Sequence, residues 1–376
     1  MSKSSAATPS ILVIRRDNIG DLACTTPLIH ALRRHYPKAR ICVLVTSYNR
    51  SVVENNPDID FVYSYMKAKH REPGQNVLGV YWNRLRLMLD LRRQRFDYAI
   101  ISGATFLSRA LRLARMIRPR HIVGFTEPGK RGAQHIDMGV PYTLPRPMHE
   151  VEDIFRLLAP LGIEGVPPHM RIYPPSAAVA QVDAVFRERR LPQQRVVGVH
   201  ISSRKPLNRW PAEKFIELIR RLSLTHDATF MLLWSPGSAA NPRHPGDDEK
   251  ARQIIDACQD IPILAYPTER LDQLMAGLDR CHVVICGDGG AMHIAAALHK
   301  PILCLFGSSD KTRWYPWGTD HILLQPASRK AVDIGVDEAL SAFEQLLIGN
   351  CENSTDVTDG ENFNRARQNT PVPRGR

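Results

Sequence analysis

Short apolar runs alternate with longer amphipathic stretches along the first half of the chain. The short runs predict buried strands, whereas apolar residues spaced three and four positions apart predict helices. Pro27 fits only the first turn of a helix, so the helix that ends near His35 should begin close behind Asp21, after a loop. The predicted strands are 11–15, 40–45 and 97–101, and the predicted helices are about 25–35, 82–95 and 105–118.

The same alternation returns after a proline-rich stretch at residues 167–175. The predicted strands here are 195–200, 228–234, 282–286 and 302–306, and the predicted helices are about 211–222, 247–258, 269–279 and 291–299. Strands that alternate with helices are typical of a parallel sheet covered on both faces. We therefore expect two similar α/β domains that face a cleft, over residues 11–170 and 171–349, and polar disordered segments at 1–10 and 350–376.

The positive charge of the chain is concentrated in one segment. The formal net charge is +12, and residues 66–131 hold 15 Lys and Arg against 4 Asp and Glu. Arg109, Arg112, Arg115 and Arg118 should lie along one side of a predicted helix. Such a local field attracts a nucleic acid, an anionic lipid or a phosphorylated acceptor, or it is only a solvated face. Nucleic acid is the least favoured partner, because the segment lacks interleaved stacking aromatic residues beyond Tyr81 and Trp82.

Three features are typical of a cytoplasmic protein. No window approaches the roughly 18 unbroken apolar residues of a membrane-spanning helix. The first ten residues lack the apolar core of a secretory signal. The seven cysteines form no CxxC pair and lie mostly in apolar runs, so we expect reduced core thiols and no disulfide framework or zinc site.

The clearest candidate for ligand chemistry is the glycine-rich segment 286–293, which lies between a predicted strand and a predicted helix. Glycines let the backbone approach a ligand closely, and the N–H groups at the start of the helix suit a phosphate or pyrophosphate. The alternative is a plain turn in which Asp288 caps the helix. The segment is not the dinucleotide-binding fingerprint, because Met292 occupies the place of the third glycine, and no GKS or GKT marks a Walker loop.

Two other turns follow predicted strands, at the edge where an open parallel sheet binds ligands. In the turn that ends at Asp21, this carboxylate is either a general base or only a loop or helix-capping residue. Segment 200–210 supplies hydroxyl groups and cations that suit anionic oxygens, or it is a solvated polar loop. The aromatic turn at 313–318 either flanks a ligand or closes the edge of the domain.

Together these segments resemble the ADP-heptose:lipopolysaccharide heptosyltransferases, glycosyltransferase family 9, over about residues 11–345. The matching motifs are N-x-G-D at 18–21, T-x-P at 25–27, D-[ST]-G-x-x-H-x-x-A-A at 288–297, L-F-G-x-[ST]-D at 305–310, R-W-x-P-x-G at 313–318, and the linker segment that begins at His149. Two positions depart from the family pattern. Gly289 stands where the family has Ser or Thr, and Asn208 stands where it has Lys.

The resemblance implies a GT-B architecture of two Rossmann-like domains and an inverting sugar transfer without metal or other cofactor. By its match to the family's catalytic aspartate, Asp21 would take the proton from an acceptor hydroxyl, while the helix N-terminus at 289–293 would stabilise the departing diphosphate. The implied donor-binding residues are Ser202, Ser203, Arg204, Lys205, Arg209, Asp248, Glu249, Asp288, Gly289, Gly290, Ala291 and His293. The implied acceptor-binding residues are Asn18, Gly20, Lys67, Lys69, Arg71, Lys130 and Arg131.

The resemblance also implies the partners. The donor would be a nucleotide sugar such as ADP-heptose, and the acceptor a phosphorylated lipid–Kdo core of lipopolysaccharide at the inner face of the cytoplasmic membrane. The basic helices at 84–95 and 109–118 would then rest on anionic lipid, since each surface cation contributes on the order of 1 kcal/mol there. Two alternatives stay open: a sugar-nucleotide epimerase or hydrolase on the same scaffold, and an inactive module that binds nucleotide sugars or anionic lipid. The oligomeric state is not indicated.

Overall fold

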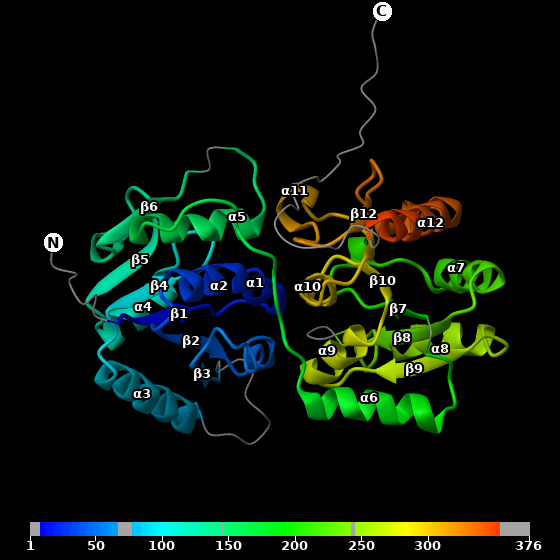
Figure 1. Ribbon diagram of the computed structural model, residues 1–376, viewed down its shortest axis with the longest axis horizontal. Coiled ribbons are helices and arrows are strands. Elements are labelled where there is room, and N and C mark those ends of the chain that lie inside the picture. Colours follow the sequence, from blue (N-terminus) through cyan, green and yellow to red (C-terminus); the bar gives the residue numbers. More distant parts are fainter. Residues whose placement is uncertain (1–7, 67–76, 144–145, 194, 242–244, 354–376) are drawn as a thin grey trace, which may run out of the picture.

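The computed structural model describes residues 8–66, 77–143, 146–193, 195–241 and 245–353. Within these ranges the chain forms two six-stranded sheets, one in each half of the molecule (Figure 1). The strand orders are β3-β2-β1-β4-β5-β6 and β12-β11-β10-β7-β8-β9, and each neighbouring pair is parallel. The two orders are the same topology, since the first strand of each half lies at the centre. This is the doubly wound Rossmann arrangement, so the predicted fold class is confirmed.

The elements of the first half surround the central strand β1. The strands are β1 (Ser10–Ile14), β2 (Arg40–Thr46), β3 (Phe61–Tyr65), β4 (Tyr98–Ile101), β5 (His121–Thr126) and β6 (Met138–Pro141). The helices are α1 (Ile19–Ala23), α2 (Thr26–His35), α3 (Val77–Arg93), α4 (Ser108–Ile117) and α5 (Glu150–Phe155), with the short 3-10 turn η1 (Arg50–Val52).

The elements of the second half surround the central strand β7. The strands are β7 (Val196–His200), β8 (Thr229–Trp234), β9 (Ile263–Pro267), β10 (Val283–Gly287), β11 (Ile302–Leu305) and β12 (His321–Leu324). The helices are α6 (Ser176–Glu188), α7 (Ala212–Thr225), α8 (Asp248–Ala257), α9 (Leu271–Asp279), α10 (Gly290–Ala297), α11 (Lys311–Trp314) and α12 (Val336–Asn353), with the 3-10 turn η5 (Pro206–Asn208).

Alternate residues of β1 point into two different layers of core, because successive side chains of a strand face opposite sides of the sheet. Leu12 and Ile14 belong to one cluster with Leu91 of α3 and Leu113 of α4. Ile11 belongs to the cluster that includes residues of α2 and α5. Since both faces of β1 are fully buried, its sequence is a continuous apolar run rather than an alternating one.

Several elements differ from the sequence predictions. Asp21 lies in the short helix α1 and not in a loop. Strand β1 already includes Ser10, and α12 continues to Asn353, beyond the positions 11 and 349 at which we placed the domain bounds. Residues 1–7 and 354–376, expected to be disordered, lie outside the described residues.

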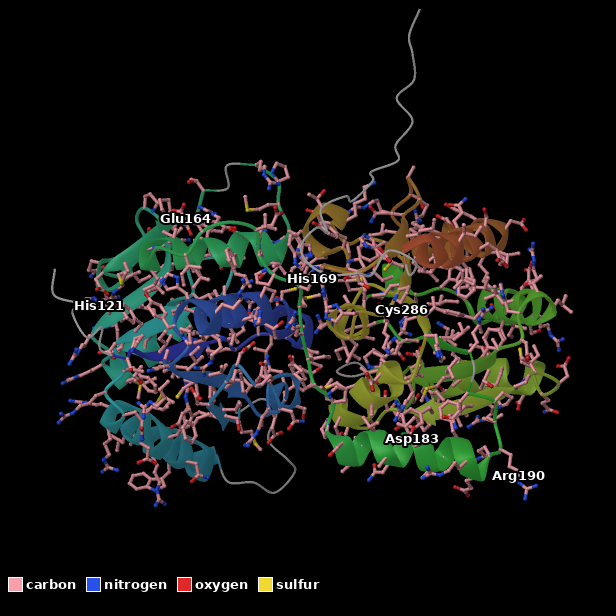
Figure 2. All side chains as sticks on the ribbon, viewed as in Figure 1. His121, Glu164, His169, Asp183, Arg190 and Cys286 are labelled. Carbon is pink, nitrogen blue, oxygen red and sulfur yellow. The ribbon has the colours of Figure 1, made fainter. Side chains whose placement is uncertain are left out.

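The two halves meet along α1 and α10, which lie side by side at the centre of the molecule (Figure 1). A linker runs from α5 between the halves to α6. Figure 2 shows His169 on this linker, where its Nδ1 donates a hydrogen bond of 2.7 Å to the carbonyl of Gly318 in the second half. Trp317 likewise donates to the carbonyl of Pro168 at 3.1 Å. The linker is therefore held to the aromatic turn of the second half.

Candidate active site

The two turns singled out in the sequence touch each other across the junction of the halves. Helix α1 follows β1 and helix α10 follows β10, so both turns lie at the carboxyl ends of central strands. Gly20 packs so tightly on the ring of His293 that a Cβ at position 20 would lie 2.5 Å from its Cδ2. Gly290 lies against Ile19 less tightly, since a Cβ at position 290 would lie 3.4 Å from the Cβ of Ile19, an ordinary contact. The site therefore includes both turns.

The carboxylate of Asp21 is held in one position by three hydrogen bonds. Its Oδ1 accepts from Nη2 of Arg15 at 2.9 Å, and its Oδ2 accepts from the backbone N–H of Asn18 at 2.9 Å and from Nδ2 of Asn18 at 2.8 Å. Burial raises the pKa of Asp21, but the charge of Arg15 and the bonds from Asn18 outweigh burial, and the net pKa is lowered. Asp21 is thus a carboxylate at neutral pH.

A chain of buried ion pairs connects Asp21 with the second half. The guanidinium of Arg15, only 2% exposed, lies 2.9 Å from both Asp21 and Glu150. Glu150, the first residue of α5, also accepts from Arg313, whose guanidinium lies 3.1 Å from Asp153. Despite burial, the surrounding carboxylates raise the pKa of Arg15, so it stays charged. Arg313 belongs to the aromatic turn, so this turn is anchored to the first half instead of simply closing a domain edge.

A second contact between the halves involves His149 at the start of α5. The side chain is fully buried. Its Nε2 donates to the carbonyl of Tyr315 at 2.8 Å, and its Nδ1 accepts from the backbone N–H of Val151 at 3.1 Å. Burial lowers the pKa of His149 to about 3. The imidazole is therefore neutral, in the tautomer that carries its proton on Nε2.

The glycine-rich turn leaves the start of α10 open. Gly289 is the N-cap residue, with φ of 156°, a backbone conformation that L side chains rarely adopt. A Ser or Thr in this backbone conformation would be strained. No side chain caps α10, and a Cβ at position 289 would meet nothing within 4 Å. The first turn of α10 therefore has no side-chain cap, and Asp288 does not cap it.

Asn208 joins three loops beside this turn. The side chain is 3% exposed. Its Oδ1 accepts from the backbone N–H of Ser308 at 2.8 Å, and its Nδ2 lies 3.3 Å from Asp288 and 3.0 Å from Ser309 Oγ. Ser309 also donates to Asp288. At this position, where the family pattern has a Lys, the chain holds an amide that joins loops, so any cation beside this turn comes from another position.

The loop after β7 offers two such cations. Arg204 and Lys205 are exposed, and the charge of Arg204 acts on Tyr48 of the first half. Ser202 Oγ accepts from the backbone N–H of Ser235 at 2.9 Å. The Ser203 carbonyl accepts from Nε of Arg209 at 2.8 Å, which holds the loop in place. Segment 200–210 is therefore a positioned loop, and Arg204 lies close enough to the first half to act on Tyr48.

The two acidic candidates on α8 differ in what their oxygens do. Asp248 accepts from Trp234 Nε1 at 2.8 Å and from the backbone N–H of Gly237 at 2.9 Å, so both oxygens hold the loop after β8. Glu249 is exposed on the next position of the helix. The carboxylate of Glu249 is therefore more available than that of Asp248 to accept a hydrogen bond from a ligand hydroxyl.

The acceptor candidates are only partly covered by the structure. Asn18 and Gly20 lie at the junction, as described above. Lys130 and Arg131 are exposed in the turn after β5, and Lys130 Nζ lies 3.2 Å from Glu127. Lys67, Lys69 and Arg71 lie outside the described residues. In the described part of the chain, no group of three His, Cys, Asp or Glu side chains is placed to hold a metal ion.

Sequence reasoning missed Arg15, Glu150 and Arg313 as members of the site. A signal was present for Arg15, because a charged residue that closes an apolar run at a strand end must find a buried partner.

None of the helices among the described residues has the length and apolar character needed to cross a bilayer.

Comparison with known proteins identifies the family of this fold and site. The profile of glycosyltransferase family 9 (heptosyltransferase) matches residues 84–335, which is more than half of the chain. Two doubly wound domains with the site between them define a GT-B glycosyltransferase, and the chain belongs to glycosyltransferase family 9. This membership favours glycosyl transfer over the epimerase or hydrolase alternative.

Individual relatives and solved structures agree with this membership. The chain is 25% identical over 306 residues to lipopolysaccharide heptosyltransferase 3 of Escherichia coli, covering 81% of this chain and 85% of the relative. It is 24% identical to lipopolysaccharide heptosyltransferase 2 of Salmonella typhimurium, covering 80% and 83%. The fold is similar to the family 9 glycosyltransferase from Veillonella parvula (TM-score 0.76, 20% identity, covering 91% and 97%). It is also similar to E. coli ADP-heptose lps heptosyltransferase II (TM-score 0.71, 19% identity, covering 91% and 99%).

Proposed function

We propose that the protein transfers a heptose, or a closely related sugar, from ADP-heptose to the inner core of lipopolysaccharide. The relatives named as lipopolysaccharide heptosyltransferases support this donor and acceptor, and they match over about four fifths of the chain. The observation that carries the proposal is the contact between Gly20 and His293. Asp21 follows Gly20, so this contact brings its carboxylate close to His293 in α10. We take the first turn of this helix as the position of the departing diphosphate, across from the acceptor hydroxyl.

In the proposed reaction, Asp21 is the general base. The carboxylate takes the proton of an acceptor hydroxyl while the hydroxyl oxygen forms a bond to the anomeric carbon. The bond between that carbon and the β-phosphate oxygen breaks on the opposite face, so the configuration inverts and ADP leaves. A lowered pKa keeps Asp21 deprotonated. The hydrogen bonds from Arg15 and Asn18 fix the orientation of its carboxylate.

The leaving diphosphate would be stabilised by fixed dipoles and cations rather than by a metal. The N–H groups of Gly290 and Ala291 lie in the first turn of α10, at the positive end of the helix dipole, where no side chain caps the helix. Ser202 and Ser203 lie on the adjacent loop. Because Asn208 is engaged in joining three loops, we assign the compensating charge to Arg204 or Lys205. Arg209 acts indirectly, since its guanidinium holds the Ser203 carbonyl.

The remaining assignments follow from which polar atoms are occupied. We assign the nucleotide ribose to Glu249 rather than Asp248, since Asp248 already accepts two hydrogen bonds. Lys130 and Arg131 would contact the anionic groups of the acceptor. Since the proposed acceptor is embedded in a membrane, the enzyme would work at the inner face of the cytoplasmic membrane as a peripheral protein.

The test compares Asp21→Asn with Asp17→Asn, the same change at a more exposed aspartate that also lies near Arg15. Transfer of heptose from ADP-heptose to a deacylated inner-core acceptor should fall at least about 100-fold in Asp21→Asn, while stabilisation of the protein by ADP-heptose against heat should persist. Asp17→Asn should keep most of the activity, and EDTA should not inhibit. Near-normal turnover by Asp21→Asn would refute the base, and release of free heptose without acceptor would favour a hydrolase.

A further inference from the structure

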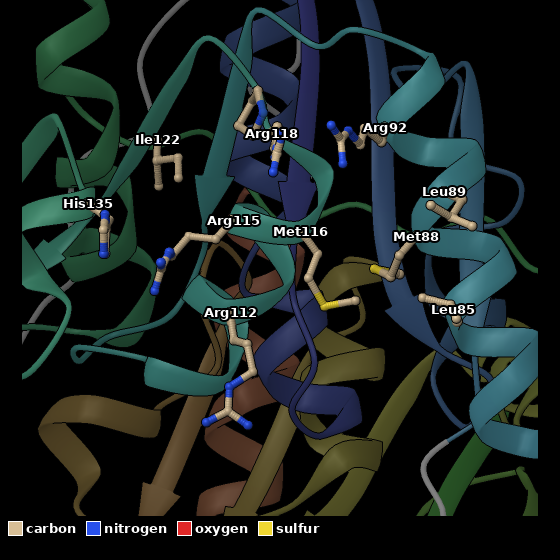
Figure 3. Close-up of a pocket in the computed structure, with 11 residues that line it drawn as sticks. Leu85, Met88, Leu89, Arg92, Arg112, Arg115, Met116, Arg118, Ile122 and His135 are labelled. Carbon is tan, nitrogen blue, oxygen red and sulfur yellow. The ribbon is translucent and has the colours of Figure 1, made fainter. Parts of the chain in front are cut away.

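A groove with a volume of about 760 Å³ lies between α3 and α4, on the outer face of the first half. It is not part of the site between the halves, since its walls come from the two helices and the start of β5. Figure 3 shows Met116 extending from α4 toward α3, and Arg92 and Arg118 turned toward one another. Leu85, Met88 and Leu89 line the groove on α3, and Arg112 and Arg115 line it on α4.

The apolar side chains around this groove are unusually exposed. Trp82 is 68% exposed, Leu85 41%, Leu89 47% and Met116 40%. Trp82, Leu85 and Leu89 are spaced three and four positions apart, so they lie on one face of α3, opposite the buried Leu91. Large apolar side chains gathered on one surface mark a contact with a membrane or a protein.

Four of the arginines around the groove have no counter-charge among the residues that the structure describes. Arg93 pairs with Asp90 and Arg120 pairs with Asp97. By contrast, Arg92, Arg112, Arg115 and Arg118 form no ion pair with any residue that the structure describes. Two guanidinium groups that converge without a carboxylate between them repel each other, and an anion placed there would relieve this repulsion. A negatively charged occupant would therefore complement the groove.

We propose that the α3–α4 groove is the surface by which this enzyme docks on an anionic lipid bilayer. The arginines of the groove bind lipid phosphates, and the exposed apolar side chains enter the layer beneath the headgroups. A protein surface that combines arginines with a few apolar side chains binds such membranes reversibly. A second copy of the chain is a poor occupant, because it would bring the same unpaired arginines against each other. Nucleic acid is disfavoured, since Trp82 is the one exposed aromatic side chain on this face among those whose burial the structure describes.

The proposal extends the proposed function, because it gives the enzyme a way to reach a membrane-bound acceptor. Binding to vesicles requires neither donor nor transfer, so the two proposals can fail separately. The full chain should sediment with vesicles of phosphatidylcholine that contain about 30% phosphatidylglycerol, and not with phosphatidylcholine alone. Binding should be lost in about 1 M salt, where the Debye length is only about 3 Å.

The double variant R112E/R115E tests the groove itself. Both side chains are exposed on α4, so the fold should be kept. Its binding to the anionic vesicles should weaken at least about 30-fold, the equivalent of about 1 kcal/mol for each of two cations. The matched control R187E/R189E makes the same change of charge at exposed positions at the end of α6, and should bind nearly normally. Equal losses in both variants would overturn the proposal.

The fluorescence of Trp82 locates the contact independently. Trp210 and Trp234 are buried, and Trp314 and Trp317 are partly buried in the aromatic turn, away from the groove. Trp82 should therefore dominate any blue shift of emission when vesicles are added. The variant Trp82→Phe should lose the shift while it keeps measurable binding. An unchanged shift in Trp82→Phe, or binding to neutral vesicles of equal strength, would refute this docking surface. Dissociation of a dimer by R112E/R115E without vesicles would instead show an interface between two copies.

Discussion

At the scale of single residues, Arg15 sets the properties of the proposed base without touching the reacting atoms. Its positive charge lowers the pKa of Asp21 against the opposing effect of burial. In Arg15→Met the pKa of Asp21 should therefore rise. Because activity is lost as pH falls through the pKa of the base, the acidic limb of the kcat/KM profile should move to higher pH. Donor KM should change little, since Arg15 lies on the acceptor side.

The variant Arg15→Lys is the control for this prediction. It keeps the charge, so the acidic limb should stay close to that of the wild type even if kcat falls. Arg15→Met should also lose about 3–5 kcal/mol of stability, because it leaves Glu150 with one cation fewer in a buried site. An acidic limb that does not move in Arg15→Met, measured in protein that remains folded, would contradict the positioning role.

At the scale of elements, the donor site depends on a close crossing of η5 and the loop after β11. A Cβ at Gly307 would lie 1.9 Å from the carbonyl oxygen of Leu207 and 2.7 Å from Oδ1 of Asn208. Gly307→Ala should therefore displace η5, cost about 1–3 kcal/mol of stability, and weaken the thermal stabilisation by ADP-heptose. Gly349→Ala is the control. It lies in α12 with nothing within 4 Å of its Cβ, so it should stabilise by up to about 1 kcal/mol.

The same scale shows what could be predicted from the sequence. Strands β1, β7 and β10 were found because both of their faces are buried, which makes their sequences continuous apolar runs. Strands such as β3 and β12 were missed because they are edge strands, and partial exposure breaks the apolar pattern. The helices α6 and α12 were also missed.

The candidate site was also predicted only in part from the sequence. The turns at Asp21 and at Gly289 were found because glycine and aspartate directly after a strand leave a local pattern. The ion pairs of Glu150 join residues 135 and 163 positions apart in the sequence. No local pattern records such a pairing, so it could be found only once the two halves were brought together.

At the scale of the whole molecule, the junction of the halves contains a neutral histidine whose protonation opposes folding. Burial lowers the pKa of His149 to about 3, whereas in the unfolded chain a histidine titrates near 6.5. Between these values the unfolded state binds more protons than the folded state. The contribution of His149 to stability is therefore complete above about pH 6.5 and is lost progressively as the pH falls toward 3.

Equilibrium unfolding in urea at several pH values should reveal this contribution. From pH 6.5 to 5 the free energy of unfolding should fall by about 2 kcal/mol on account of His149 alone, in addition to the effect of other buried groups such as His200, whose pKa burial lowers to about 4. His149→Gln keeps a donor for the Tyr315 carbonyl but cannot titrate. The slope of its free energy of unfolding against pH should therefore be smaller by an amount that corresponds to the uptake of about one proton. His35→Gln, at an exposed position of α2, should keep the slope of the wild type. If His149→Gln kept that slope as well, protonation at the junction would not limit the stability of the enzyme in acid.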